Sequence, residues 1–480
     1  MLVRTSLSTL LVTRSNVTAN VQYYITKLKL YYCGHQLQAH NKMSTKMEAL
    51  KHPKVAVVMV PFLEQSHLNS LLHLSHLIAS YQIPVHYVAS PTHIRQATLR
   101  YQGHHDPLLS TYIHFHGFHL PPHSLAPPKP DPSSRFPIHL LPVFESSTHL
   151  RQPFCQLLQD LSPDFERIVV IHDCNMASVV QDVSLVVPNA ESYSFFGISA
   201  FSLFLMFWDG IIEKPFQLDH SDVDPSSIPS DDGFIPPEIM KFVLQQFSFL
   251  GLERGRLYNT SRVLEGRYVE LLEKLSGNSD IKHFAIGPFN PVDLTSSRSG
   301  NKERHECLEW LDKQEKDTVL YISFGSTTSM NDEQINELAQ GLEKSGQKFI
   351  WVIRKADTAD VFAANEARNA QLPEGYKERM KDRGMVIREW APQLEILGHS
   401  STGGFMSHCG WNSCIESISM GVPIMAWPMH SEQPKNAFLV SEVLKVGMLV
   451  RDLESHDRII KSSTIENVVR RMMRQRKETR

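Results

Sequence analysis

Polar residues in the C-terminal half of the chain, between a predicted strand and a predicted helix, have the types and spacing needed to hold a diphosphate. The apolar run 403–407 is followed by a turn that contains His408 and Asn412, and Ser413 begins a helical pattern. Such a turn gathers free backbone N–H groups and the positive end of a helix dipole, and these side chains could add donors. Spacing alone leaves a second interpretation open, because Ser413 and Glu416 also fit a capping box.

A histidine and an aspartate follow two apolar runs in the N-terminal half. His67 comes shortly after the run 54–60 and opens a stretch with apolar residues at helical spacing. A helix N-terminus favours the neutral imidazole, which can accept a proton. Asp173 ends the run 167–172, at the strand edge where open αβ sheets gather their ligands. Taken alone, the histidine could also be a capping or surface residue, and the aspartate could simply cap a helix.

A run of histidines offers a metal site as a further alternative. These residues are His104, His105, His114, His116, His119 and His123. A zinc site needs fixed ligands and a second cluster, whereas alternating His and Phe over 113–119 is typical of an edge strand. We therefore predict no metal. The donor stretch also has neither a GxGxxG sequence nor a P-loop, which disfavours a Rossmann dehydrogenase.

Two series of strands and helices must position these residues. The chain has 480 residues, of which 42% are hydrophobic and 21% charged, so it can form two globular domains. Apolar runs at 318–323 and 348–353 enclose an amphipathic helix pattern over 332–345. The run 192–208 is too short and broken for a membrane span, and we expect a buried helix there. The expected divisions are a basic extension over 1–47, an acceptor domain over 48–278, a donor domain over 279–452 and a C-terminal segment over 453–480.

Composition indicates which binding partners and which cellular compartment to expect. The net charge of −3 gives no electrostatic case for nucleic acid or an anionic membrane. Six cysteines without CxxC spacing suit a reducing compartment, so we expect a cytoplasmic protein. The extension contains lysines and arginines but no acid, as in a transit peptide for plastids or mitochondria. Alternatively, the extension is an upstream artefact of the gene model, and the chain starts at Met43 or Met47.

The stretch 390–433 closely resembles the donor-sugar box of plant family-1 UDP-glycosyltransferases, from Trp-Ala-Pro-Gln to the closing Glu-Gln pair. The family has the GT-B fold, an α/β architecture of two Rossmann-like domains facing each other across a cleft. By position, the resemblance implies that Trp390 stacks on the uracil beside Ala391, that Gln393 lies beside the uridine and that Glu416 binds the ribose. It also implies that the diphosphate is held by His408, Asn412 and Ser413, and the sugar by Trp411, Glu432 and Gln433. Ser326 would face the donor from the opposite wall.

The same resemblance implies the reaction. His67 would be the catalytic base and Asp173 would orient its imidazole, as in hydrolase triads. The enzyme would be an inverting O-glycosyltransferase that uses UDP-glucose as co-substrate and needs no cofactor. Its partners would be the UDP-sugar and a small hydroxylated acceptor, and it would act as a monomer without stable membrane insertion. The terminal Gln433 usually accompanies glucose, although xylose stays open.

Motifs in the N-terminal half narrow the resemblance to zeatin O-glucosyltransferases, which glycosylate a hydroxyl of a cytokinin. These motifs lie at 172–173, 176–182, 188–192 and 258–266. A flavonoid or another phenolic acceptor is the alternative. Family members continue beyond 453–480 with helices that return to the N-terminal domain. A catalytically impaired nucleotide-sugar binder with weakly coupled domains is therefore a further alternative.

Overall fold

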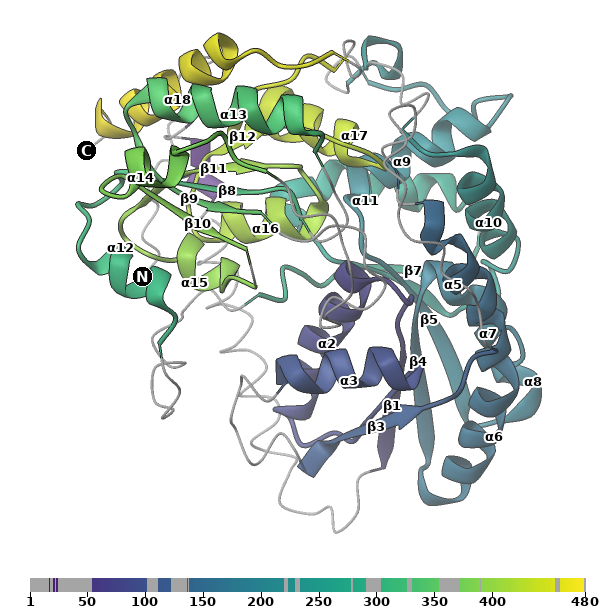
Figure 1. Cartoon of the computed structure of the whole chain (residues 1–480). Coiled ribbons are helices and arrows are strands. Elements are labelled where there is room, and N and C mark those ends of the chain that lie inside the picture. The colour runs from purple at the N-terminus through teal and green to yellow at the C-terminus, as the bar shows by residue number, and fades with distance from the viewer. Residues whose placement is uncertain are drawn as a thin grey trace, which may run out of the picture.

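The computed structural model of the chain describes residues 17, 20, 21, 23, 24, 54–101, 111–121, 136, 138–219, 223–228, 234–277, 279–290, 304–325, 330–353, 371–388, 390–453 and 458–478. These residues form two domains, each built on a parallel sheet flanked by helices (Figure 1). The α/β architecture agrees with the expectation from the sequence.

The N-terminal sheet has the order β3-β2-β1-β4-β5-β6-β7 and is parallel throughout. The strand order reverses between β1 and β4, so the carboxyl ends of these two neighbours open onto one point. The strands are β1 (Val55–Val60), β2 (Val85–Ala89), β3 (Ile113–Gly117), β4 (Arg167–Asp173), β5 (Ala190–Phe196), β6 (Gly255–Tyr258) and β7 (Lys282–Ala285). The helices are α2 (Gln65–Ala79), α3 (Pro91–Tyr101), α5 (Leu141–Ser146), α6 (Arg151–Leu161), α7 (Ala177–Val180), α8 (Val183–Val186), α9 (Ala200–Gly210), α10 (Pro237–Phe247) and α11 (Arg262–Leu275).

The C-terminal sheet repeats this plan in the order β10-β9-β8-β11-β12-β13. Here the reversal falls between β8 and β11. The strands are β8 (Val319–Ser323), β9 (Lys348–Val352), β10 (Gly384–Ile387), β11 (Thr402–Ser407), β12 (Ile424–Ala426) and β13 (Gly447–Leu449). The helices are α12 (Glu306–Asp312), α13 (Asp332–Ser345), α14 (Tyr376–Met380), α15 (Gln393–Leu397), α16 (Trp411–Ser419), α17 (Gln433–Phe438) and α18 (Ser462–Glu478).

Two expectations about segment boundaries differ from the structure. The run 192–208 is not one helix, because 190–196 forms strand β5 beside β4 and α9 begins only at Ala200. Its apolar residues are buried in either conformation, so hydrophobicity alone did not distinguish strand from helix. The N-terminal sheet also continues past 278, since β7 (Lys282–Ala285) pairs with β6.

The domains share apolar packing where α9 meets α17. Phe201 of α9 stacks on Phe438 of α17, with ring centroids 6.1 Å apart and planes inclined by 7°. Both rings belong to one hydrophobic cluster that includes buried residues of the two domains. This contact fixes the two domains against each other next to the carboxyl ends of both sheets.

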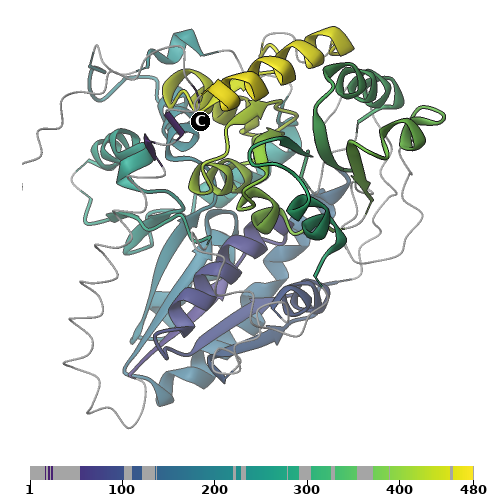
Figure 2. The same cartoon turned by 90° about the vertical axis from the view of Figure 1, so that its left-hand side faces the viewer.

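Helix α18 lies along the outside of the C-terminal domain and packs against α13 (Figure 2). Its residues Ile465 and Met472 are fully buried. Gly341 of α13 permits this close approach, because an added Cβ would lie 2.7 Å from the Cβ of Ile465. At its far end, Arg476 forms an ion pair of 3.0 Å with Asp317. The C-terminal helix is therefore an integral part of the donor domain.

A few residues of the basic extension also contact the C-terminal domain. Val17 and Val21 are helical and buried in the shared hydrophobic cluster. The Asn20 amide donates to the backbone carbonyl of Lys445 at 2.9 Å. The described part of the extension thus packs on the fold.

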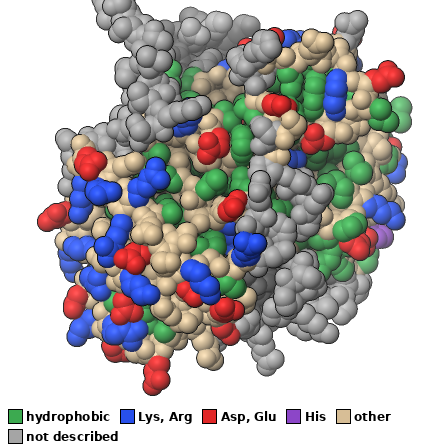
Figure 3. Space-filling view, turned by 90° about the horizontal axis from the view of Figure 1, so that it is seen from above, with side chains coloured by type: hydrophobic (Ala, Val, Ile, Leu, Met, Phe, Trp, Pro, Cys, Tyr) green, Lys and Arg blue, Asp and Glu red, His purple; other side chains and the backbone are tan. Residues whose placement is uncertain are grey.

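The described surface carries charges of both signs. On the face seen in Figure 3, basic and acidic side chains are interspersed over the described surface. Among the described residues, no helix combines the length and the apolar character that a membrane crossing requires.

Candidate active site

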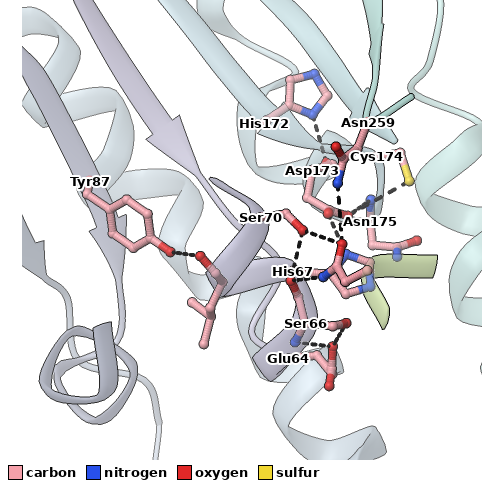
Figure 4. A network of polar contacts seen from close by, with 12 residues as sticks. Glu64, Ser66, His67, Ser70, Tyr87, His172, Asp173, Cys174, Asn175 and Asn259 are labelled. Carbon is pink, nitrogen blue, oxygen red and sulfur yellow. Dashed lines mark hydrogen bonds and ion pairs between the residues drawn. The ribbon is translucent and has the colours of Figure 1, made fainter. Parts of the chain in front are cut away.

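His67 and Asp173 meet at the point where the N-terminal strand order reverses. β1 ends at Val60, and a short loop places His67 in the first turn of α2. β4 ends at Asp173, so the neighbouring strand brings the carboxylate beside the imidazole. The His67 Nδ1 lies 2.5 Å from Asp173 Oδ2, as Figure 4 shows. The histidine side chain is 18% exposed and the aspartate is fully buried.

Further hydrogen bonds hold the aspartate in place. Asp173 Oδ1 accepts the backbone N–H of Asn175 at 2.9 Å. On the histidine side, Glu64 caps α2 by accepting the backbone N–H of Ser66 at 2.8 Å. Because Nδ1 is occupied by Asp173, the Nε2 atom of His67 is the nitrogen left for a substrate proton.

The charge state of His67 differs from the expectation based on the helix dipole. Burial by itself would lower the pKa of His67, but the adjacent Asp173 carboxylate, with Glu64 and Glu432, raises this pKa to about 9. A full negative charge at hydrogen-bond distance outweighs the partial charge of a helix end. The expected preference for the neutral ring was therefore wrong, because the carboxylate stabilises the imidazolium form of His67.

The turn 408–413 lies at the corresponding reversal in the C-terminal sheet, after β11 and opposite the end of β8. The His408 ring is enclosed by two glycines, since a Cβ added at Gly325 or at Gly410 would lie 2.7 or 2.6 Å from its Nε2. Burial lowers the pKa of His408 to about 4, so the ring is neutral at physiological pH. His408 would therefore contribute a single N–H donor rather than a positive charge.

Helix α16 begins earlier than expected, which removes the capping-box alternative. Its first residue is Trp411 and its N-cap is Gly410, so Ser413 is inside the helix. The Glu416 carboxylate instead accepts from the Gln393 amide at 2.8 Å, and the same amide lies 3.1 Å from Ser413 Oγ. Burial raises the pKa of Glu416 to about 7. Glu416 thus faces α15 rather than its own helix end.

The uridine wall begins with the exposed residue Trp390. Its side chain is 51% exposed, whereas Ala391 beside it is buried. Gln393 at the start of α15 accepts from the Tyr321 hydroxyl at 3.3 Å. An exposed indole next to a fixed amide and a carboxylate is an arrangement suited to a base and a ribose.

Asn412 is directed toward the acceptor domain. Its Nδ2 donates to the Ser66 carbonyl at 3.0 Å, and its Oδ1 accepts from Ser70 Oγ at 3.0 Å and from Asn259 Nδ2 at 3.3 Å. The residue expected to hold the diphosphate therefore links the turn 408–413 to the helix that carries His67.

Two of the expected sugar-binding side chains have protein partners. The Trp411 indole is buried and donates to the Asn259 carbonyl at 2.8 Å. Gln433 Oε1 accepts the backbone N–H groups of Met429 and His430 at 2.9 and 3.0 Å. Contacts from Trp411 to a sugar would have to come from its backbone. The Glu432 carboxylate, whose pKa is raised by burial, accepts from the Asn436 amide at 3.4 Å.

Several site residues escaped the sequence analysis. Ser66, Ser70 and Asn436 carry no pattern of their own that would indicate their hydrogen bonds to the other domain. Asn259 falls within the 258–266 motif, so that motif was the available signal. Ser326 lies outside the described residues and its expected role stays a prediction.

Some histidines of the run lie near one another at the edge of the N-terminal sheet. His116 Nε2 lies 2.9 Å from His86 Nδ1 at the edge of the N-terminal sheet. Burial, together with the neighbouring His116 and His114, lowers the pKa of His86 to about 4. Among the described residues, no group of three or more His, Cys, Asp or Glu side chains is arranged to hold a metal ion. His104, His105 and His123 lie outside the described residues.

Comparisons with known proteins identify the family of the chain. Residues 53–291 match the family model described as glycosyltransferase, N-terminal domain, and residues 292–478 match UDP-glucoronosyl and UDP-glucosyl transferase. The chain is 52% identical to a zeatin O-glucosyltransferase of Phaseolus lunatus, over 88% of each chain. It is 50% identical to a zeatin O-xylosyltransferase of Phaseolus vulgaris, over 88% of this chain and 89% of the relative.

A solved structure confirms the fold. The crystal structure of a UGT transferase from Siraitia grosvenorii in complex with UDP aligns with a TM-score of 0.67 and 28% identity. The alignment covers 88% of this chain and 93% of that chain. The two parallel-sheet domains are those of the GT-B fold, as the donor-box resemblance implied.

Proposed function

Because the chain belongs to the UDP-glucoronosyl and UDP-glucosyl transferase family and is a UDP-sugar-dependent O-glycosyltransferase, we propose that it transfers glucose to a hydroxyl of the cytokinin zeatin. The observation that carries the proposed chemistry is the His67–Asp173 pair, whose helix α2 is bonded through the Ser66 carbonyl to Asn412 of the turn 408–413. The base and the diphosphate turn come from different domains and meet through this contact.

The proposed mechanism is a single displacement. His67 Nε2 removes the proton of the acceptor hydroxyl while that oxygen forms a bond to the anomeric carbon. The bond from this carbon to the diphosphate oxygen breaks on the opposite side, and UDP leaves with inverted configuration at the sugar. Asp173 stabilises the imidazolium, and the N–H groups at the start of α16 stabilise the charge that develops on the leaving diphosphate.

The donor contacts are proposed residue by residue. Trp390 stacks on the uracil beside Ala391, and Gln393 and Glu416 bind the uridine ribose. His408 and Ser413 hold the diphosphate with the backbone of the turn, and Asn412 joins them when it exchanges partners with the donor. Glu432 and Gln433 define the sugar end together with the Trp411 backbone. Ser326 completes the site from the opposite wall.

The choice of sugar and acceptor rests on the relatives. The two relatives at 52% and 50% identity are named for zeatin but for different sugars, glucose and xylose. A relative named for anthocyanidin is only 30% identical, so a flavonoid acceptor has less support. The shared core at Phe201 and Phe438 gives the domains a fixed contact, so an impaired binder is also not favoured.

Compartment and cofactors complete the proposal. The described cysteines are free thiols, which suits the reducing cytoplasm. The reaction needs no cofactor besides the UDP-sugar, because helix α16 and neutral donors can stabilise the diphosphate. We propose a monomer, since the two walls of the site come from one chain.

The test is a transfer assay with two donors. The full chain is incubated with UDP-glucose or UDP-xylose and with zeatin, a flavonoid or a simple phenol, and products are identified by mass spectrometry. The expected product is zeatin O-glucoside. A phenolic glucoside without a zeatin product would assign another acceptor, and UDP binding without any transfer would favour the impaired binder.

A further inference from the structure

Asn436 connects the two domains immediately behind the turn 408–413. It lies on α17 and is fully buried. Its Oδ1 atom is 2.7 Å from Ser199 Oγ and 3.0 Å from Ser202 Oγ, both of which belong to the acceptor domain. One amide oxygen therefore accepts from the cap and the first turn of α9.

The other half of the same amide faces the donor side. Asn436 Nδ2 donates to the backbone carbonyl of Cys409 at 2.9 Å. Its second hydrogen is directed toward Glu432 Oε1 at 3.4 Å. A carbonyl and a carboxylate can only accept, so the orientation of this amide is fixed by its partners.

Cys409 is the residue of the turn that most needs such support. Its φ of +66° lies in the left-handed region, which is uncommon for residues other than glycine. The Cys409 N–H donates to Ser407 Oγ at 3.1 Å, and its carbonyl accepts from Asn436. Holding both backbone groups fixes the direction in which the following N–H groups of Gly410 and Trp411 point.

The acceptor-domain end of the link is also rigid. The Glu265 carboxylate accepts the backbone N–H groups of Phe201 at 2.9 Å and Ala200 at 3.2 Å, which closes the N-terminus of α9. Ser199 Oγ accepts the backbone N–H of Ser202 at 3.1 Å. Asn436 thus joins the strained turn to a capped helix, not to a loose segment.

From these contacts we propose that Asn436 is a positioning residue for sugar transfer. Its amide fixes the orientation of the Cys409 carbonyl, and therefore of the N–H groups of the turn, and it holds the Glu432 carboxylate toward the sugar. The same amide also bonds to α9, so it connects the turn and Glu432 to the acceptor domain. The inference rests on the proposed function, since Asn436 touches no substrate and acts through the turn 408–413 and Glu432.

The experiment compares Asn436→Ala with a matched asparagine. Asn189 accepts from Ser162 Oγ at 2.8 Å and donates to the carbonyls of Ser162 and Phe165 at 3.1 and 2.7 Å, before β5 at the opposite end of the sheet. Asn189→Ala therefore removes an amide with three hydrogen bonds outside the site, compared with four for Asn436. A third variant, Ser199→Ala with Ser202→Ala, removes only the hydrogen bonds from α9 to Asn436. The hydrogen bonds of Asn436 to Cys409 and Glu432 remain.

Kinetics, calorimetry and hydrogen exchange are measured on the full chain. Asn436→Ala should lower kcat on the order of 10²-fold while the Kd for UDP changes less than about tenfold, because a misplacement of about 1 Å affects chemistry more than nucleotide binding. The double serine variant should lower kcat less. The proposal would be overturned if kcat of Asn436→Ala fell no more than kcat of Asn189→Ala. It would also be overturned if UDP affinity fell by as large a factor as kcat.

Hydrogen exchange separates this inference from the proposed function. With UDP present, the amides of 409–413 should exchange faster in Asn436→Ala than in the wild type and in Asn189→Ala. If the wild type transfers no sugar, the proposed function fails, yet this comparison still decides the role of Asn436. Equal exchange in all three proteins would contradict it.

Discussion

The Asn412 amide nitrogen donates to the backbone carbonyl of Ser66 across 3.0 Å, one residue before His67. Ser70, one helical turn further along α2, donates to the oxygen of the same amide. Helix α2, which carries His67, and the turn 408–413 are thus connected by a side chain rather than by the backbone. The position of the base therefore depends on the conformation of the donor turn.

Replacement of the base should abolish transfer without abolishing nucleotide binding. We expect His67→Ala to lower kcat/KM by on the order of 10²–10⁴-fold, as for loss of a general base, with the Kd for UDP nearly unchanged. His76→Ala, near the end of the same helix, is the control and should keep its turnover. Near-normal turnover in His67→Ala would disprove the assignment.

Activity should rise with pH up to the pKa of His67. The base must be neutral to accept a proton, and the pKa of His67 is raised to about 9 by Asp173. We expect kcat/KM to increase between about pH 7 and 9 and then level off. Asp173→Asn should move the midpoint to lower pH, because burial without the carboxylate lowers the pKa. An unchanged midpoint would exclude Asp173 as its cause.

The same pair should make stability depend on pH. The folded-state pKa of His67 lies above the unfolded value of about 6.5, so its contribution is complete below pH 6.5. This contribution should be lost as the pH rises from about 6.5 to 9. The difference in thermal unfolding temperature between wild type and Asp173→Asn should shrink over that window. A difference that grows with pH would contradict the charge assignment.

On the donor side, Glu416→Ala should weaken UDP binding more than Ser431→Ala. Glu416 is held by Gln393 toward the uridine wall, whereas the Ser431 hydroxyl contacts His430 at 2.8 Å. Loss of a charge-assisted hydrogen bond costs about 1.5–3 kcal/mol, or about 10- to 150-fold in Kd. Isothermal titration calorimetry measures both variants. Equal affinities would leave Glu416 a purely structural role.

Transfer should continue in the presence of EDTA. The proposed site stabilises the diphosphate with a helix N-terminus and neutral donors, and no step requires a metal. The assay compares turnover before and after chelation, and then after Zn²⁺ or Mg²⁺ is added back. A loss that either ion restores would direct attention back to the histidines near β3.

Local signals predicted the elements best. The helix expected over 332–345 has those bounds in the structure, because Asn331 accepts the backbone N–H of Gln334 at its start and Gly346 adopts φ +70° at its end. These signals lie within a few residues of the ends they fix. Strand β5 was missed because an apolar run does not itself specify strand or helix. The segment becomes a strand because it pairs with β4, which lies outside that run.

Side-chain directions in the site could not be predicted from the sequence alone. The family pattern identified Trp411 and Asn412, but their partners Asn259 and Ser66 are 152 and 346 residues away. Asn436 had no local signal, since three of the four residues that it binds, Ser199, Ser202 and Cys409, are at least 27 positions away in the sequence. The charge of His67 was misjudged because the sequence shows the helix end but not the distance to Asp173.

The contact between Asn20 and Lys445 has a consequence for biosynthesis. The two residues are 425 positions apart, so a segment that is synthesised early binds one that is synthesised much later. At about 5–20 residues per second, roughly 20–85 seconds of translation separate them. During that interval the apolar face with Val17 and Val21 has no completed docking surface, so the nascent chain should be a substrate for chaperones that bind early N-terminal segments.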